Sequence, residues 1–126
     1  MDDRKRHKAG MKVRRELLGD AHVDRAKANE SEFSAPFQDF ITRCAWGEIW
    51  TRPGLPRKTR SLITIGMMVA LNRADELRLH QRAAANSGVT RKEIQEVLLH
   101  AAVYCGVPAA NSAFHIAEEV FAETGK

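Results

Sequence analysis

The spacing of apolar residues along the chain constrains the fold more than any other feature. Apolar side chains recur every three or four positions in segment after segment, which is typical of helices. The most apolar stretch, residues 57–72, contains β-branched residues that also suit a strand. Its length, the absence of strict alternation and the lack of a partner strand favour a helix. The sequence therefore predicts an all-α fold.

The first 34 residues are expected to form one helix and a connection. Residues 4–18 carry a weak apolar stripe, and Gly19 follows as a stop signal. The polar stretch from Gly19 to Ser34 predicts a connection that has room for a short helix. Residues 1–30 are therefore interpreted as a basic N-terminal helix and its connection.

A second helix is expected after Ser34, which resembles an N-cap, with Pro36 in the first turn. Phe37 and Phe40 recur at helical spacing and predict a face that packs in the core. Prolines and a glycine between residues 52 and 56 then break the helix. The helix end and loop carry four residues of interest: Trp46, Glu48, Trp50 and Arg52.

Four more helices are expected in the rest of the chain. The helix over residues 57–72 has little polar surface and is predicted to be buried on most sides. A capping box, Thr90 to Glu93, predicts the start of another helix. Short links favour antiparallel neighbours. The expected architecture is a single-domain helical bundle of five to six helices spanning residues 1–126.

Charge and composition exclude several classes of protein. The net charge is +4, and its excess lies at the N-terminus, with nine Lys/Arg against five Asp/Glu through Lys27 and eleven against eleven afterwards. This basic segment contains no aromatic residue for base stacking, so we expect no nucleic-acid binding. No apolar run approaches the roughly 18 residues of a membrane span. The charged start lacks a signal-like apolar region, which favours a cytoplasmic protein.

The two cysteines do not form a reactive or metal-binding pair. Cys44 and Cys105 are far apart, and neither belongs to a Cys-x-x-Cys motif. In a cytoplasmic chain each is expected to be a small buried hydrophobe. We therefore predict no metal site and no dithiol active site.

Glu76 and His80 are the first candidate catalytic pair. They are four residues apart, so on a helix they lie on the same side, one turn from each other. A carboxylate beside an imidazole fixes the ring tautomer and suits the ring to acid–base work. The same pair is also an ordinary surface contact of helices, so the spacing leaves both interpretations open.

Polar residues elsewhere could complete a site. His100 and Tyr104 form a second pair at this spacing on an otherwise apolar helix, where they either bond each other or line a cavity. Arg52 and Arg60, near the Pro/Gly loop, suit two-pronged binding of a carboxylate. If Trp46 and Trp50 are core residues, Glu48 faces either a cleft or solvent, and only the cleft would make it functional.

Four ordered motifs closely resemble the carboxymuconolactone decarboxylase family: W-G-E-I-W-T-R-P-G-L, R-S-L-I-T-I, E-L-R-L-H and L-L-H-A-A-V-Y-C-G-V-P-A-A. The resemblance covers nearly the whole chain. It implies the all-α fold of alkylhydroperoxidase-D-like proteins and a homo-oligomer, specifically a hexamer. In the thiol-active relatives two cysteines precede the histidine that matches His80. Here those positions are Arg73 and Glu76, which argues against peroxide reduction.

The resemblance also implies an activity, which is cofactor-free decarboxylation of a dicarboxylate lactone in protocatechuate catabolism. His80, Glu76 and Glu48 are the expected catalytic residues. The expected substrate-binding residues are Arg52, Arg60, His100, Tyr104 and Trp50. Two alternatives stay open: a redox protein of the same superfamily without the dithiol, and a helical oligomer or nucleic-acid-binding protein that is not an enzyme.

Overall fold

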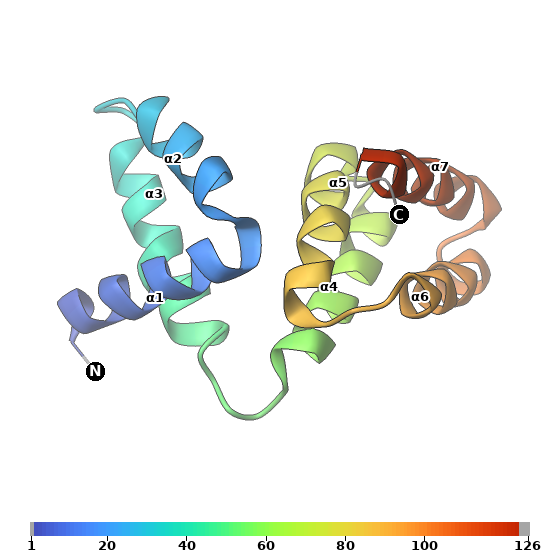
Figure 1. Cartoon of the computed structure of the whole chain (residues 1–126), viewed down its shortest axis with the longest axis horizontal. Coiled ribbons are helices and arrows are strands. Elements are labelled where there is room, and N and C mark those ends of the chain that lie inside the picture. The colour runs from blue at the N-terminus through green and yellow to red at the C-terminus, as the bar shows by residue number, and fades with distance from the viewer. Residues whose placement is uncertain (1, 124–126) are drawn as a thin grey trace. The chain divides into compact units, whose positions relative to one another are not determined.

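The computed structural model describes residues 2–123 and is helical throughout, with no strand in that range. The all-α prediction is confirmed. The expected number of five to six helices is wrong, because the described part contains seven α-helices, a π-helix and a short 3₁₀-helix. The chain divides after Pro56 into two compact units (Figure 1). Each unit is described by itself, and the single-domain organisation stays a prediction.

The first unit is built around its N-terminal helix. The Asp2 side chain caps this helix by accepting a hydrogen bond from the Lys5 backbone N–H at 2.8 Å. Gly19, with φ of 91°, ends it as predicted. The bounds of the helices are α1 Asp3–Leu18, α2 Asp20–Ala28, α3 Ala35–Ile41 and the π-helix η1 Thr42–Ile49.

Helix α2 occupies most of the stretch that we expected to be a connection. Asp20 lies in its first turn, where a carboxylate suits the helix dipole, and Val23 is fully buried. The Arg15 guanidinium joins the two helices through ion pairs with Asp20 at 3.0 Å and Asp24 at 2.9 Å. One buried valine and these pairs hold a helix whose apolar pattern is too weak to recognise from sequence.

Two predictions about α3 are wrong. Ser34 precedes the helix but makes no capping hydrogen bond, because its hydroxyl instead pairs with Ser31 in a turn. Phe37 and Phe40 are 60% and 54% exposed, and α3 has no buried residue. Their spacing defines a helical face but not whether another segment covers it, and within the described residues both rings stay more than half exposed.

The polypeptide from Trp46 to Arg52 also differs from expectation. We expected a helix end and loop from Trp46 onward, but the helix continues in π-helical form to Ile49 and the turn begins at Trp50. π-Helical hydrogen bonding is rare in proteins, and the single π-helical turns that interrupt α-helices are frequently found at functional sites.

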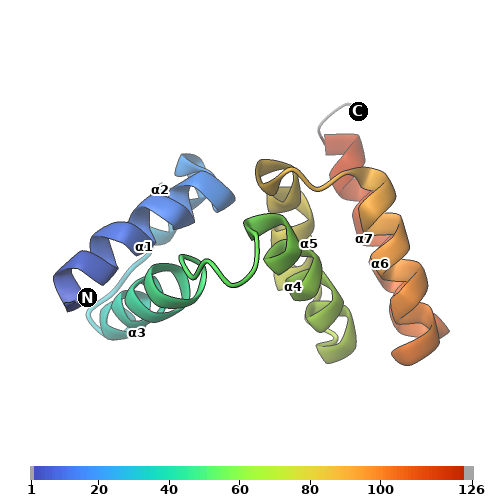
Figure 2. The same cartoon turned by 90° about the horizontal axis from the view of Figure 1, so that it is seen from below.

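The second unit is a four-helix bundle, with α4 packing against both α5 and α6, and α7 also packing against both (Figure 2). Helix α6 thus packs mainly against α4 and α7 rather than against α5, which precedes it in the chain. The core includes Ile65, Leu98 and Ala113, each fully buried. The bounds are α4 Arg57–Leu71, α5 Ala74–Ala83, the 3₁₀-helix η2 Ala84–Ser87, α6 Arg91–Tyr104 and α7 Val107–Glu123.

Helix α4 is less buried than predicted. Ser61, Ile65 and Val69 form its buried stripe, spaced by four residues. Ile63, at 41% exposure, and Met67, at 55%, lie on a different face that the second unit leaves uncovered. Helix α4 therefore carries large apolar side chains on a second face, outside the buried stripe that contributes to the core of this unit. No helix in the described range is long and apolar enough to cross a membrane.

The capping box at the start of α6 is confirmed. The Glu93 backbone N–H donates to Thr90 Oγ1 at 3.1 Å, and the Thr90 N–H donates to Glu93 Oε1 at 2.9 Å. Lys58 Nζ lies 2.8 Å from the other Glu93 oxygen and joins α4 to this corner. Lys58, and then the Thr90 N–H, lower the pKa of the Glu93 carboxyl below its usual value.

This lowered pKa predicts a pH-dependent contribution to stability. Since the folded state favours the carboxylate, the contribution is complete above the ordinary value of 4.5 and is lost as the pH falls through the lower folded pKa. Glu93→Gln keeps a capping side chain but removes the charge, so we expect a lower Tm at neutral pH. The difference from wild type should shrink in thermal unfolding below pH 4.5. Glu96→Gln, exposed on the same helix, is the control; an equal loss there would contradict the assignment.

Candidate active site

Glu76 and His80 both lie in the unbroken helix α5, so the predicted separation of one turn is present. Glu76 is exposed in the first turn, where its charge suits the helix dipole, and His80 is half-buried. The neighbouring stripe of the helix, with Leu77 and Gln81, is buried. The helix therefore presents the candidate acid–base pair along its partly exposed side.

Contacts to α7 hold α5 in place. The Gln81 side-chain amide donates to the Ala113 backbone carbonyl at 3.4 Å inside the bundle. Arg82 forms a two-pronged ion pair with Glu123, with both nitrogen–oxygen distances at 2.9 Å. These contacts hold α5, the helix that carries His80, against α7.

His100 and Tyr104 are adjacent rings on α6, with centroids 5.0 Å apart and planes tilted by 35°. Both side chains are exposed, and both line a hollow of about 900 Å³ in the second unit. Its wall combines apolar groups of α4 and α6 with charged residues from the start of α6. The remaining lining residues are Leu62, Ile63, Gly66, Thr90, Lys92, Glu93, Glu96, Val97, Ala101 and Cys105.

His80 is not among the residues that line this hollow. It lies on α5, whereas His100 and Tyr104 lie on α6, and helices α4 and α7 each pack against both. Arg60 lies in the first turn of α4 and is half-buried, next to Ser61, whose hydroxyl bonds Ser87 at 2.9 Å. Neither His80 nor Arg60 therefore lines the hollow that His100 and Tyr104 share.

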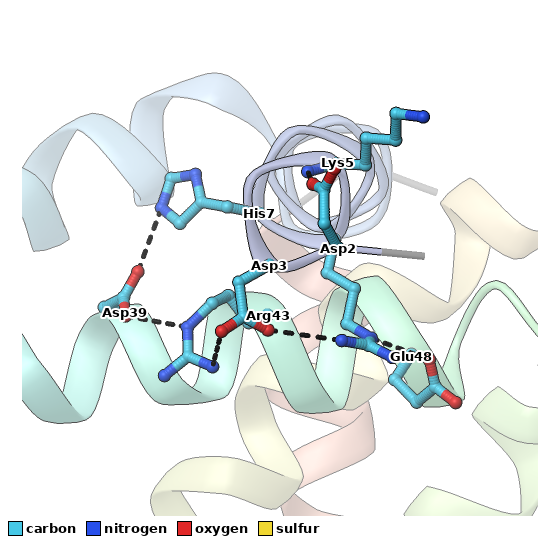
Figure 3. A network of polar contacts seen from close by, with 8 residues as sticks. Asp2, Asp3, Lys5, His7, Asp39, Arg43 and Glu48 are labelled. Carbon is cyan, nitrogen blue, oxygen red and sulfur yellow. Dashed lines mark hydrogen bonds and ion pairs between the residues drawn. The ribbon is translucent and has the colours of Figure 1, made fainter.

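Glu48, Trp50 and Arg52 belong to the first unit, at the end of η1 and in the turn after it. Trp50 stacks on the buried Trp46 with ring centroids 5.2 Å apart, and Arg52 is exposed. Glu48 Oε2 accepts a hydrogen bond from Arg6 Nε at 3.1 Å (Figure 3). Glu48 therefore contacts the N-terminal helix.

The residues that hold η1 against α1 could not be recognised from the sequence. Arg14 is buried, and its guanidinium donates to Thr42 Oγ1 at 3.4 Å and to Gln38 Oε1 at 3.1 Å. Burial lowers the pKa of Arg14. Arg6 reaches Glu48 across 42 positions of sequence, so no local pattern could reveal the contact.

The structure also locates the potential metal ligands and the two cysteines. No group of three or more His, Cys, Asp or Glu side chains is placed to hold a metal within residues 2–123. Cys44 and Cys105 are half-buried thiols on different units, so they are less buried than expected.

The model of the carboxymuconolactone decarboxylase family matches residues 35–119. The chain belongs to this family. A relative from Acinetobacter baylyi, named 4-carboxymuconolactone decarboxylase, is 54% identical over 125 residues, which cover 99% of this chain and 93% of the relative. A protein of the same name from Pseudomonas putida is 52% identical over 48 residues, 38% of this chain and all of that sequence.

Another relative differs in its named substrate. The nitrosuccinic acid decarboxylase of Metarhizium robertsii is 47% identical over 110 residues, 87% of this chain and 77% of the relative.

The match to the family model begins at Ala35, the first residue of α3. Helices α1 and α2 therefore lie outside the part of the chain that the family model matches.

Proposed function

We propose that this chain decarboxylates 4-carboxymuconolactone to the enol-lactone of β-ketoadipate, in the cytoplasm and as a step of protocatechuate catabolism. The observation that carries the proposal is the 54% identity, over nearly the full length of both chains, to a relative named for this activity. The presence of histidine at position 80, without the cysteines of the thiol-active relatives, supports proton transfer rather than redox chemistry.

The substrate contains its own electron sink, so the reaction needs no cofactor. The bond between the ring carbon and its carboxylate breaks, and CO₂ leaves. The electron pair moves through the ring alkene onto the lactone carbonyl, and a proton then adds to the ring carbon beside that carbonyl. The enzyme has three tasks: to hold the second carboxylate, to stabilise negative charge on the carbonyl oxygen, and to deliver the proton.

Each task has a candidate residue. Arg52 and Arg60 bind the side-chain carboxylate, because guanidinium groups grip carboxylates in two-pronged fashion. Protonated His80, which Glu76 orients, donates the proton to the substrate. Solvent then reprotonates the imidazole of His80.

The remaining candidates shape the pocket. Tyr104 and His100 donate hydrogen bonds to the developing oxyanion beside the apolar wall of their hollow. Trp50 supplies a further apolar surface that excludes water from the departing carboxylate. Glu48 is a second acid–base group at the end of η1.

These roles require His80 to reach the same substrate as His100 and Tyr104, whose hollow it does not line. This favours a homo-oligomer, and we propose a hexamer. The single chain leaves many large apolar side chains exposed, more than scattered surface residues would explain. Sedimentation equilibrium of the purified protein measures the assembly directly, and a monomer at assay concentration would contradict it. The exposed side chains include Phe37, Phe40, Ile63, Met67, Leu71, Leu99, Val103 and Val107.

The proposal is tested by incubating the purified chain with 4-carboxymuconolactone while following CO₂ release and enol-lactone formation. We expect one CO₂ for each enol-lactone without added metal or cofactor. A flat trace from folded protein would contradict the proposal.

Nitrosuccinate is the second candidate substrate, because the relative named for it is 47% identical. Both compounds are dicarboxylates with a group that can take up the electrons left by the departing CO₂. In nitrosuccinate this acceptor is the nitro group, and in 4-carboxymuconolactone it is the conjugated lactone. Parallel assays compare kcat/KM for the two, and we expect the lactone to be preferred. A higher kcat/KM for nitrosuccinate would reverse the assignment of the substrate.

A further inference from the structure

The N-terminal helix α1 lies in backbone contact with the π-helix η1. A methyl group added to Gly10 would collide with the Thr42 carbonyl oxygen and lie 2.7 Å from the Gly47 nitrogen. A methyl group on Gly47 would collide with the Arg6 carbonyl oxygen. Since both glycines are buried at this crossing, α1 and η1 have one register in which they fit.

The Arg6 side chain extends this contact to Glu48. Its Nε donates to Glu48 Oε2 at 3.1 Å, and its Nη1 donates to Asp3 Oδ1 at 3.2 Å. Both carboxylates raise the pKa of Arg6, with Glu48 the larger influence. The guanidinium is therefore held from two sides, and it restricts the rotation of the Glu48 carboxylate.

A second arginine holds Asp3 in turn. Arg43 donates to Asp39 at 2.8 Å and lies 3.7 Å from Asp3 (Figure 3). His7 approaches the other oxygen of Asp39 at 3.7 Å. The contacts link these side chains in an order in which positive and negative charges alternate: Asp39, Arg43, Asp3, Arg6 and Glu48. This network ties α1 to the last turn of η1.

The residues after Glu48 depend on the same turn. Trp50 stacks on Trp46, which is buried in η1, and Arg52 donates its backbone N–H to the Ile49 carbonyl at 3.1 Å. These contacts tie the turn that carries Trp50 and Arg52 to the last turn of η1. Arg6 contacts the same last turn of η1 through Glu48.

We propose that Arg6 is a positioning residue for the decarboxylation, acting through Glu48 at the end of η1. This inference rests on the proposed function, in which Glu48, Trp50 and Arg52 contact or process the substrate. It assigns a role to α1, which lies outside the match to the family model. Arg6 itself does not touch the reacting atoms; its guanidinium sets the direction of the Glu48 carboxylate.

Arg15 provides a matched control on the same helix. The Arg6 and Arg15 side chains are 31% and 30% exposed, and each pairs with two carboxylates. Arg15, however, forms both of these ion pairs with α2, through Asp20 and Asp24. Arg6→Gln is expected to lower kcat roughly tenfold, because a misplaced reacting group can cost up to ~10²-fold in rate. Arg15→Gln should leave kcat unchanged. Arg6→Lys, which keeps the charge but not the planar fork, should recover part of the rate.

A double-mutant cycle distinguishes positioning from general destabilisation. If Arg6 acts through Glu48, then Arg6→Gln should have no further effect on kcat in a Glu48→Gln background. Independent, multiplying effects would overturn the proposal, as would equal losses in the Arg6 and Arg15 variants.

Fluorescence gives a readout that does not depend on turnover. Trp46 and Trp50 are the two tryptophans of the chain, and each is two positions from Glu48 in the sequence. Arg6→Gln should change the emission and increase iodide quenching, while Arg15→Gln should not. If the wild-type protein failed to convert the lactone, the proposed function would fail, but this comparison would still decide whether Arg6 holds the end of η1. Identical spectra in all variants would overturn the inference.

Discussion

Replacing His80 with alanine is expected to lower kcat for 4-carboxymuconolactone by about 10²- to 10⁴-fold, the usual contribution of a positioned proton donor. The imidazole is proposed to protonate the ring carbon after CO₂ has left, so its loss should affect kcat more than KM. Steady-state measurement of enol-lactone formation gives both constants. His115→Ala, an exposed histidine on α7 of the same unit, is the matched control and should behave like wild type.

The source of the proton can be tested separately from the rate. In D₂O the wild-type enzyme should place deuterium on one face of the new methylene group, because His80 donates from one side only. Residual turnover of His80→Ala should lose this facial selectivity, since water then delivers the proton. Full turnover with unchanged selectivity in the variant would remove His80 from the mechanism.

Features that depend on neighbouring residues in the sequence could be predicted. The capping box of Thr90 and Glu93 involves groups three positions apart, and the stop at Gly19 requires a single residue with positive φ. Glu76 and His80 share a helix side for the same reason, since four residues make about one turn. In each case the determining interaction is local, so its pattern is visible in the sequence.

Features set by packing between distant segments could not be predicted. The spacing of Phe37 and Phe40 defines a face of α3 but carries no information on whether another segment covers it. The ion pair of Arg6 and Glu48 spans 42 positions, and the π-helical form of η1 accompanies contact with α1. The candidate pair of Glu76 and His80 could therefore be recognised from its spacing, whereas the contact of Arg6 with Glu48 needed the structure.

The crossing of α1 and η1 predicts a mutation whose effect opposes helix propensity. Alanine is favoured over glycine by up to about 1 kcal/mol within a helix, so Gly47→Ala would be stabilising on propensity alone. At position 47, however, the added methyl group would collide with the Arg6 carbonyl oxygen, which belongs to a backbone and cannot rotate away. Overpacking of this kind costs about 1–3 kcal/mol, so the clash should win and Gly47→Ala should lower the stability of the first unit.

Gly54→Ala is the control for this substitution, because a methyl group there meets no atom within 4 Å. It should change the unfolding free energy by no more than about 0.5 kcal/mol in either direction. Denaturant unfolding followed by tryptophan fluorescence reports on the first unit, since Trp46 and Trp50 both lie in it. Because Gly47 immediately precedes Glu48, the same variant should also lower kcat under conditions where it stays folded. A Gly47→Ala protein as stable and active as Gly54→Ala would show that α1 can move away from η1 at little cost, and that contact with α1 does not fix the position of Glu48.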